Sequence, residues 1–231
     1  MSNAFAFDLG DWFSDKATEI QKNLKRSFGG ERGSRFTGCW FEPFASASSA
    51  DQFESTDILA VKALSVAVPI ESAAQLIVTE ADRFNMMLTK IPKDVDLWQV
   101  ARSEVEPQSS AAELHAALKS LDGVGYVTAG KLLAAKRPRL IPILDSKVEQ
   151  LLKPPPNRFW VTMHDQLSNG ARRRRSPKCV PVRPATSACC GGSMWRSGCT
   201  QPTGHGLGND DPRVAALRGT QVEWIAATDS H

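Results

Sequence analysis

Two glycines flank a valine at residues 123–125, and Thr128 and Ala129 follow them closely. Glycines carry no side chain, so a corner built from them leaves its main-chain N–H groups bare. If a helix begins at this corner, its first N–H groups point outward and carry a partial positive charge, which suits a phosphate oxygen. The stretch therefore predicts a contact with an anionic backbone.

The residues expected to take part belong to the corner, to the helix after it and to the basic run that follows. They are Gly123, Val124, Gly125, Tyr126, Thr128, Lys131, Lys136, Arg137 and Arg139. Contacts of this kind read only the phosphates of duplex DNA, so we expect DNA binding without sequence preference. The alternative is that the Gly-x-Gly turn is only a tight connection, and that the chain is a non-enzymatic helical protein-protein interaction module.

Two helices must position this corner. Residues 110–113, Ser-Ala-Ala-Glu, have the form of a capping box and predict the start of the first helix. Gly123 ends that helix, where a left-handed backbone favours glycine. Val124 then points back as an apolar plug between the helices. We expect the second helix over residues 126–135.

The rest of residues 36–168 also has helical spacing, and no stretch shows sustained alternation of apolar and polar residues. We predict an all-α fold, a small helical bundle that contains a helix-hairpin-helix. The expected helix starts are Thr56, Pro69, residues 79–82 and Asp96, and a closing helix is expected over residues 157–167.

The pattern apolar-x-Gly-Val-Gly-x-x-Thr-Ala resembles the helix-hairpin-helix motif of DNA-binding and DNA-repair proteins. Over residues 110–152 it resembles the HhH-GPD DNA glycosylase superfamily, because Asp145 stands twenty residues after Gly125 in the run Leu-Asp-Ser-Lys-Val. The resemblance implies that Asp145 is a catalytic carboxylate, which stabilises positive charge on the sugar or activates water as a flipped base departs. Asp145 also suits the cap of a helix over residues 146–152, and both roles can hold together.

The glycosylase pattern is incomplete. Val127 stands where lyase-competent members hold a Schiff-base lysine, so any enzyme of this type would be a monofunctional hydrolase without lyase activity. Lys147 replaces the histidine of that family, and no cysteine-rich iron-sulfur loop follows. The span from Trp40 to Trp160 looks more like an uncharacterised bacterial family with the same Gly-Val-Gly, Lys-Arg-Pro-Arg-Leu-Ile-Pro and Asp pattern.

Other chemistry-bearing side chains have plainer explanations. The aromatic residues Trp98, Tyr126 and Trp160 could stack on an extruded base, but aromatics at helical spacing are more often core. His115 and His164 have no second histidine at ligand spacing, so we expect them at the surface or the edge of the core.

Charge and composition limit the function classes. Net charges of +1, −3 and +5 fall on residues 1–36, 37–169 and 170–231, so DNA binding must rest on local geometry and not on global charge. No apolar stretch approaches ~18 residues and no secretory signal starts the chain, which predicts a cytoplasmic protein. The cysteines form no C-x-x-C pair, and we expect no metal ion and no other cofactor.

The two ends differ from the centre. Residues 1–35 form a leader with a short amphipathic helix over 8–28 and a flexible glycine-rich joint. Residues 169–231 are basic and rich in Cys, Pro and Gly, and they predict a disordered tail. One hypothesis is that this tail is read out of frame; an uninterrupted frame on resequencing would refute it.

Overall fold

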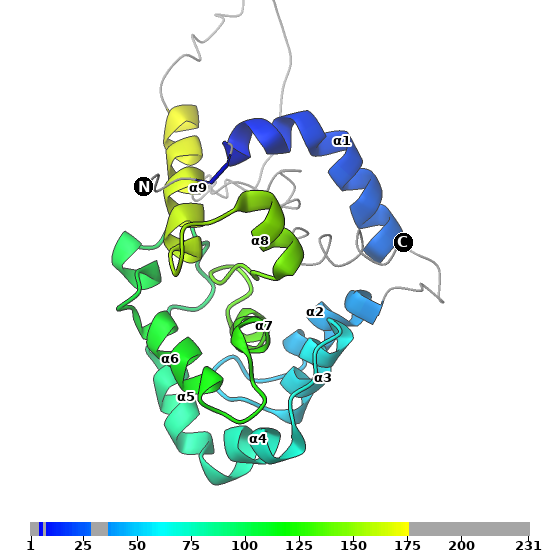
Figure 1. The fold of residues 1–231 in the computed structure, drawn as a ribbon, viewed down its shortest axis with the longest axis vertical. Coiled ribbons are helices and arrows are strands. Elements are labelled where there is room, and N and C mark those ends of the chain that lie inside the picture. Colours follow the sequence, from blue (N-terminus) through cyan, green and yellow to red (C-terminus); the bar gives the residue numbers. More distant parts are fainter. Residues whose placement is uncertain (1–4, 7, 29–36, 176–231) are drawn as a thin grey trace, which may run out of the picture.

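The structure, a computed structural model, describes residues 5–6, 8–28 and 37–175 (Figure 1). Every regular element in these ranges is a helix, which confirms the all-α prediction. The predicted flexible joint and most of the predicted tail lie outside the described residues. Among the described residues, no helix is both long enough and apolar enough to cross a membrane.

Nine α-helices and three shorter helical turns make up the described chain. The α-helices are α1 (Leu9–Phe28), α2 (Phe41–Ser46), α3 (Ser55–Ala63), α4 (Ile70–Ala74), α5 (Ala81–Thr89), α6 (Ser110–Lys119), α7 (Tyr126–Lys136), α8 (Ser146–Leu152) and α9 (Phe159–Arg175). The turns are η1 (Thr37–Trp40), η2 (Gln75–Thr79) and η3 (Arg102–Val105). Helix α9 continues beyond the predicted domain end at residue 168, into the predicted tail.

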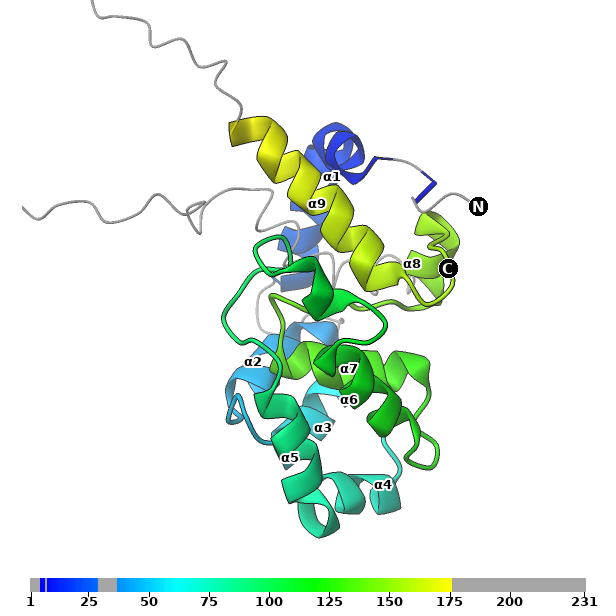
Figure 2. The ribbon, with the colours of Figure 1, turned by 90° about the vertical axis from the view of Figure 1, so that its left-hand side faces the viewer.

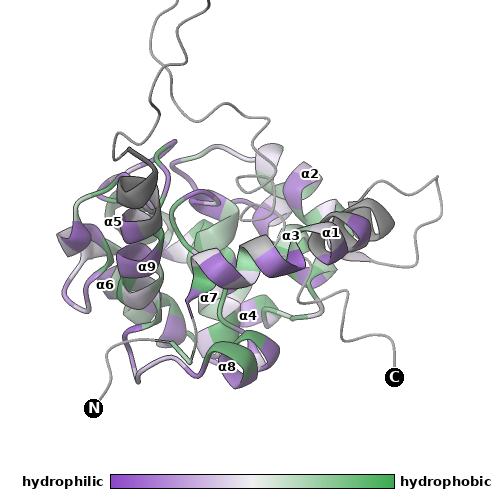
Figure 3. Cartoon of the chain, turned by 90° about the horizontal axis from the view of Figure 1, so that it is seen from above, coloured by the Kyte–Doolittle hydropathy of each residue, from purple (hydrophilic) through white to green (hydrophobic). Residues whose placement is uncertain are grey.

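Helix α7 lies at the centre of the molecule (Figures 1 and 2). It packs against α6, α3 and α2, and seen from above it lies between α6 and α9 on one side and α2 and α3 on the other (Figure 3). All of its residues from Thr128 to Lys136 are buried. A helix that is enclosed on all sides leaves only its ends to meet solvent, and the amino-terminal end of α7 is the corner at Gly125.

Two apolar clusters hold α7 in place. Ala129, Leu132 and Leu133 belong to the main core, and Ala134 and Ala135 pack with Phe41, Ala60, Leu64 and Ile143 in a second cluster. Burying one of the larger of these apolar side chains stabilises the fold by about 1.5–3 kcal/mol. Together the two clusters fix the direction of α7 and therefore the position of the corner.

Several helix starts differ from the prediction by a residue or two. Helix α3 is capped by Glu54 and not by Thr56, because the Glu54 and Asp57 side chains exchange hydrogen bonds with each other's main chain. Helix α6 is capped by Ser109, whose Oγ accepts from Ala112 N at 3.2 Å. Asp96 opens no helix: a turn follows it at residues 97–99, and its carboxylate accepts from Arg139 Nε.

Candidate functional site

The connection between α6 and α7 is a sharp corner at residues 120–125. Gly123 has a φ of +67°, the left-handed conformation predicted for it. A Cβ on Gly123 would lie 2.6 Å from Pro69 Cγ, so packing also requires glycine here. Val124 is buried between the helices, as predicted, and its N–H donates to Leu121 O at 3.1 Å. The inner side of the corner is therefore fixed by backbone and packing.

Gly125 is different, because nothing within the protein requires a glycine there. Its φ of −79° and ψ of 177° are extended backbone that any residue adopts. A Cβ on Gly125 would meet no atom within 4 Å. Gly125 is exposed, as is its neighbour Tyr126. The outer side of the corner is open space that an external group can approach closely.

The main-chain N–H groups at this open side are available. Gly125 is the cap of α7 and has no side chain to accept from them. The first backbone hydrogen bond of α7 runs from the N–H of Ala129 to the carbonyl oxygen of Gly125, at 3.0 Å. Within the described residues, the N–H groups of Tyr126, Val127 and Thr128 have no acceptor. Three donors with the partial positive charge of a helix start therefore follow the open position, and two of them belong to residues that are not buried, Tyr126 and Val127.

The lysines of the predicted basic cluster point inward, and the expectation that they contact phosphate is wrong in this conformation. Lys131 is 4% exposed, and its Nζ donates to Leu64 O at 2.7 Å. Lys136 Nζ lies 2.5 Å from Asp57 Oδ2, with both side chains at most 1% exposed. Burial lowers the pKa of both ammonium groups, and it raises the pKa of Asp57 against the opposing effect of Lys136. These lysines hold the core together.

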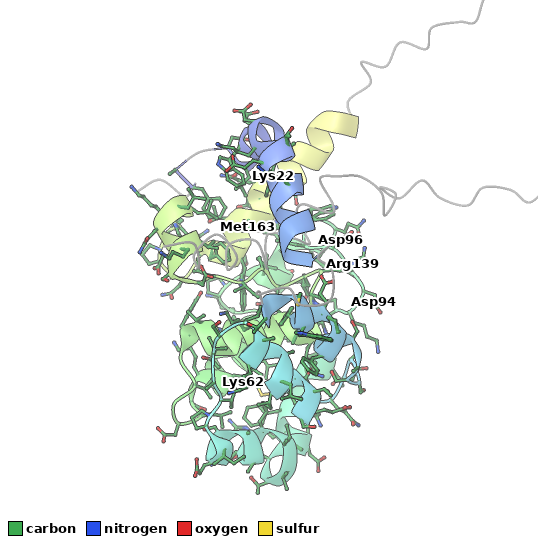
Figure 4. All side chains as sticks on the ribbon, turned by 90° about the vertical axis from the view of Figure 1, so that its right-hand side faces the viewer. Lys22, Lys62, Asp94, Asp96, Arg139 and Met163 are labelled. Atoms are coloured by element: carbon green, nitrogen blue, oxygen red, sulfur yellow. The ribbon has the colours of Figure 1, made fainter. Side chains whose placement is uncertain are left out.

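The two arginines of that cluster are also engaged inside the protein. Arg137 is buried and donates to Leu88 O at 2.8 Å and Ile91 O at 3.0 Å, at the end of α5. Arg139 is partly exposed, but its guanidinium makes two hydrogen bonds of 2.8 Å to Asp96. The two residues are labelled beside each other in Figure 4. The burial of Arg137 corrects the predicted phosphate contact for that residue, whereas the contact predicted for Arg139 stays a prediction.

Lys119 is the cation that the sequence analysis missed. It is exposed, it is the last residue of α6, and its Nζ lies 5.6 Å from the centroid of the Tyr126 ring. The signal was available, because the last turn of one helix in a tight hairpin must lie beside the first turn of the next. Acidic groups are also near: Asp122 is exposed in the turn, and the charge of Glu149 contributes to raising the pKa of Tyr126.

A row of three aromatic rings begins at the corner with Tyr126 and runs inward. The rings of Tyr126 and His115 meet edge to face at 4.6 Å and 73°, and those of His115 and Trp160 at 5.5 Å and 80°. His115 Nε2 lies 3.0 Å from Tyr126 O, and Trp160 Nε1 donates to Pro142 O at 3.1 Å. His115 is buried, and burial lowers its pKa. The row of rings joins the exposed Tyr126 to α9.

Asp145 caps α8 as predicted. Its Oδ1 accepts from Lys147 N at 3.0 Å and from Val148 N at 2.9 Å. Its charge lies close enough to Lys131 to oppose the lowering of that lysine's pKa. Glu149, also in α8, acts on Tyr126 in the same direction, since its charge contributes to raising the pKa of the phenol. The capping role is established by this geometry, whereas the catalytic role stays a prediction.

The two glycines of the corner should respond differently to alanine. Gly123→Ala should lower the free energy of unfolding by more than about 1 kcal/mol, because alanine is strained at a left-handed position and would meet Pro69. Gly125→Ala should change it by less than about 1 kcal/mol, because the freedom that the unfolded chain loses offsets the poorer helix cap that alanine makes. Urea unfolding followed by circular dichroism measures both. Equal losses in the two variants would show that Gly125 is also needed for folding.

Comparison with known proteins gives one match. Residues 20–180 match a family described as a family of unknown function (DUF6308), a range that includes the corner and Asp145. No curated protein and no solved structure matches the chain. The expected likeness to an uncharacterised family is thus confirmed. None of these comparisons supports the resemblance to DNA glycosylases.

Proposed function

The chain belongs to the DUF6308 family of unknown function, and we propose that its corner between α6 and α7 binds the phosphate backbone of nucleic acid, with duplex DNA as the ligand. The observation that carries the proposal is the open position at Gly125. Neither the backbone nor the packing of the protein needs a glycine there, and the absent side chain leaves open space beside the start of α7, whose first three N–H donors have no acceptor among the described residues. A phosphate oxygen fits such a group of donors.

The charges around the corner support a weak and non-specific contact. Lys119 supplies one cation beside the donors, while Asp122 and Glu149 oppose an anion. With the lysines and arginines at residues 131–139 buried or paired, few phosphates are neutralised, and the affinity should lie in the non-specific range of about 10⁻⁴–10⁻⁶ M. Main-chain donors make no contact with base edges, so no sequence preference is expected.

The test is the salt dependence of binding to a short fluorescein-labelled duplex of mixed sequence, followed by anisotropy. The logarithm of the binding constant should fall with the logarithm of salt concentration, with a slope of about −0.9 for each phosphate neutralised. A slope near −1 to −2 is expected from one cation and one helix start. No binding at low salt, or binding that salt does not change, would exclude the proposal.

Glycosylase chemistry at Asp145 is a further part of the proposal that needs its own variant. Asparagine caps a helix about as well as aspartate, whereas alanine costs about 0.5–2 kcal/mol. Asp145→Asn should therefore fold as stably as the parent and lose any release of bases from damaged duplex, while Asp145→Ala should also lose stability. Base release by the Asp145→Asn protein at the rate of the parent would rule out the catalytic role.

A second candidate is a protein-interaction module. It is favoured by large apolar side chains that remain exposed on α4, η2 and α5: Ile70, Val78 and Met86. Contacts made through these side chains would bury apolar area and depend little on salt. The salt titration therefore separates the two candidates.

A further inference from the structure

We propose that Tyr126 stacks against an unpaired base, so that the corner prefers nucleic acid in which an unpaired base lies beside a duplex. This inference rests on the proposed function of the corner. It adds a partner class, gapped or partly single-stranded nucleic acid, that phosphate contacts alone do not select.

The first observation is where the ring lies. Tyr126 directly follows the open position at Gly125 and is the first residue of α7. It is 36% exposed, although every residue of α7 from Thr128 onward is buried. Tyr126 is therefore a partly exposed residue at the place where the free N–H donors are, and it directly follows the open position.

The second observation is that the ring is held in place. His115 meets the Tyr126 ring edge to face, and the same imidazole bonds through Nε2 to the Tyr126 carbonyl. Trp160 supports His115 from behind and is itself tied to Pro142 O. A ring fixed before binding loses little conformational freedom when a ligand stacks on it, which favours binding.

The third observation concerns the chemistry around the ring. An aromatic face, an ammonium at 5.6 Å from its centroid and free main-chain N–H groups together match the parts of a nucleotide, a base and a phosphate. Bases in a continuous duplex are stacked on each other and present only their edges in the grooves. A base can reach the Tyr126 ring only where it is unpaired and unstacked.

The hydroxyl of Tyr126 is not needed for this role. Within the described residues it has no hydrogen-bond partner, and burial together with the charge of Glu149 raises the pKa of the phenol. The ring therefore stays uncharged near neutral pH. Phenylalanine at this position keeps the aromatic face and provides a matched control.

The experiment compares two labelled DNAs of the same sequence, a continuous duplex and a duplex with a one-nucleotide gap, by anisotropy at low salt. The parent and Tyr126→Phe should bind the gapped DNA about tenfold more tightly than the continuous duplex, the effect of one base stacked on an aromatic ring. Tyr126→Ala should lose this preference and bind both DNAs with equal affinity. A 2-aminopurine in the unpaired position should lose fluorescence on binding to the parent and not to Tyr126→Ala.

Each other outcome counts against the inference. Equal binding of both DNAs by the parent, or a preference that survives in Tyr126→Ala, would overturn it. Equal losses on both DNAs in Tyr126→Ala would show a role for the ring in folding or in phosphate contact only, and would overturn it as well. Binding of the continuous duplex that weakens with salt would still uphold the proposed function, whereas no binding of either DNA would remove both.

Discussion

Lys136→Met should lower the free energy of unfolding by about 3–5 kcal/mol, because it leaves the carboxylate of Asp57 buried without its counter-charge. The two groups are 2.5 Å apart and at most 1% exposed. Lys136 also donates to Ser48 Oγ at 2.7 Å and to Ser49 O at 2.9 Å, so the pair ties the end of α7 to the loop between α2 and α3. Methionine fills a similar volume, which limits the loss to the charge and its hydrogen bonds.

The double variant Lys136→Met with Asp57→Asn is the control. Asparagine is neutral and still accepts from Glu54 N, which Asp57 does at 2.7 Å. It should recover at least half of the loss if an unpaired charge is the cause. Urea unfolding measures the parent, both single variants and the double variant, and additive losses in the double variant would contradict this explanation.

The pH dependence of the single variant follows from the same pair. Burial already raises the pKa of Asp57 in the parent, and removing Lys136 should raise it further. The folded state then binds a proton that the unfolded chain releases above a pKa of about 3.9. The variant's stability should therefore fall as pH rises above that value, so that its deficit relative to the parent is larger at neutral pH than near pH 4.

Gly125→Glu should weaken binding of duplex DNA by tenfold or more, the largest effect expected on function. The new side chain would enter the open position, place a carboxylate beside the N–H groups of Val127 and Thr128, and repel phosphate. An acid at a helix start is favourable by about 0.3–1 kcal/mol, so the variant should be at least as stable as the parent. Loss of binding without loss of stability is the expected result.

Gln52→Glu is the matched control for this change. Gln52 is exposed and lies in the loop whose carbonyls bind Lys136 and Arg137, at the opposite end of α7 from the corner. The Gln52→Glu substitution adds the same charge to the protein as Gly125→Glu does, but far from the open position. Equal weakening by Gln52→Glu and Gly125→Glu would mean that net charge, and not the corner, governs binding.

The local features of the fold were predictable because they depend on neighbours in sequence. Helix α8 has the predicted bounds, since Asp145 satisfies the first N–H groups of the helix that follows it. Gly123 takes the left-handed conformation that ends a helix, and Val124 fills the space behind it. These are short-range effects of capping and backbone sterics.

The direction of the basic side chains was not predictable from such patterns. Lys131 and Lys136 lie on a helix that is enclosed on all sides, so no polar face distinguishes them from exposed lysines. Their partners, Leu64 and Asp57, are remote in sequence and are brought near only by the packing of α3 on α7. The basic residues after the glycine corner therefore predicted a contact with a ligand, whereas in the fold these lysines bind groups inside the protein.

The most direct measurement is the change in the ¹H–¹⁵N spectrum when duplex DNA is added to the labelled full-length chain. If the corner binds phosphate through its main chain, the largest shifts should fall on the amides of Tyr126, Val127 and Thr128, and they should vanish as salt is raised. Shifts confined to other surfaces, such as the exposed apolar residues Val78 and Met86, or no shifts at all, would contradict the account.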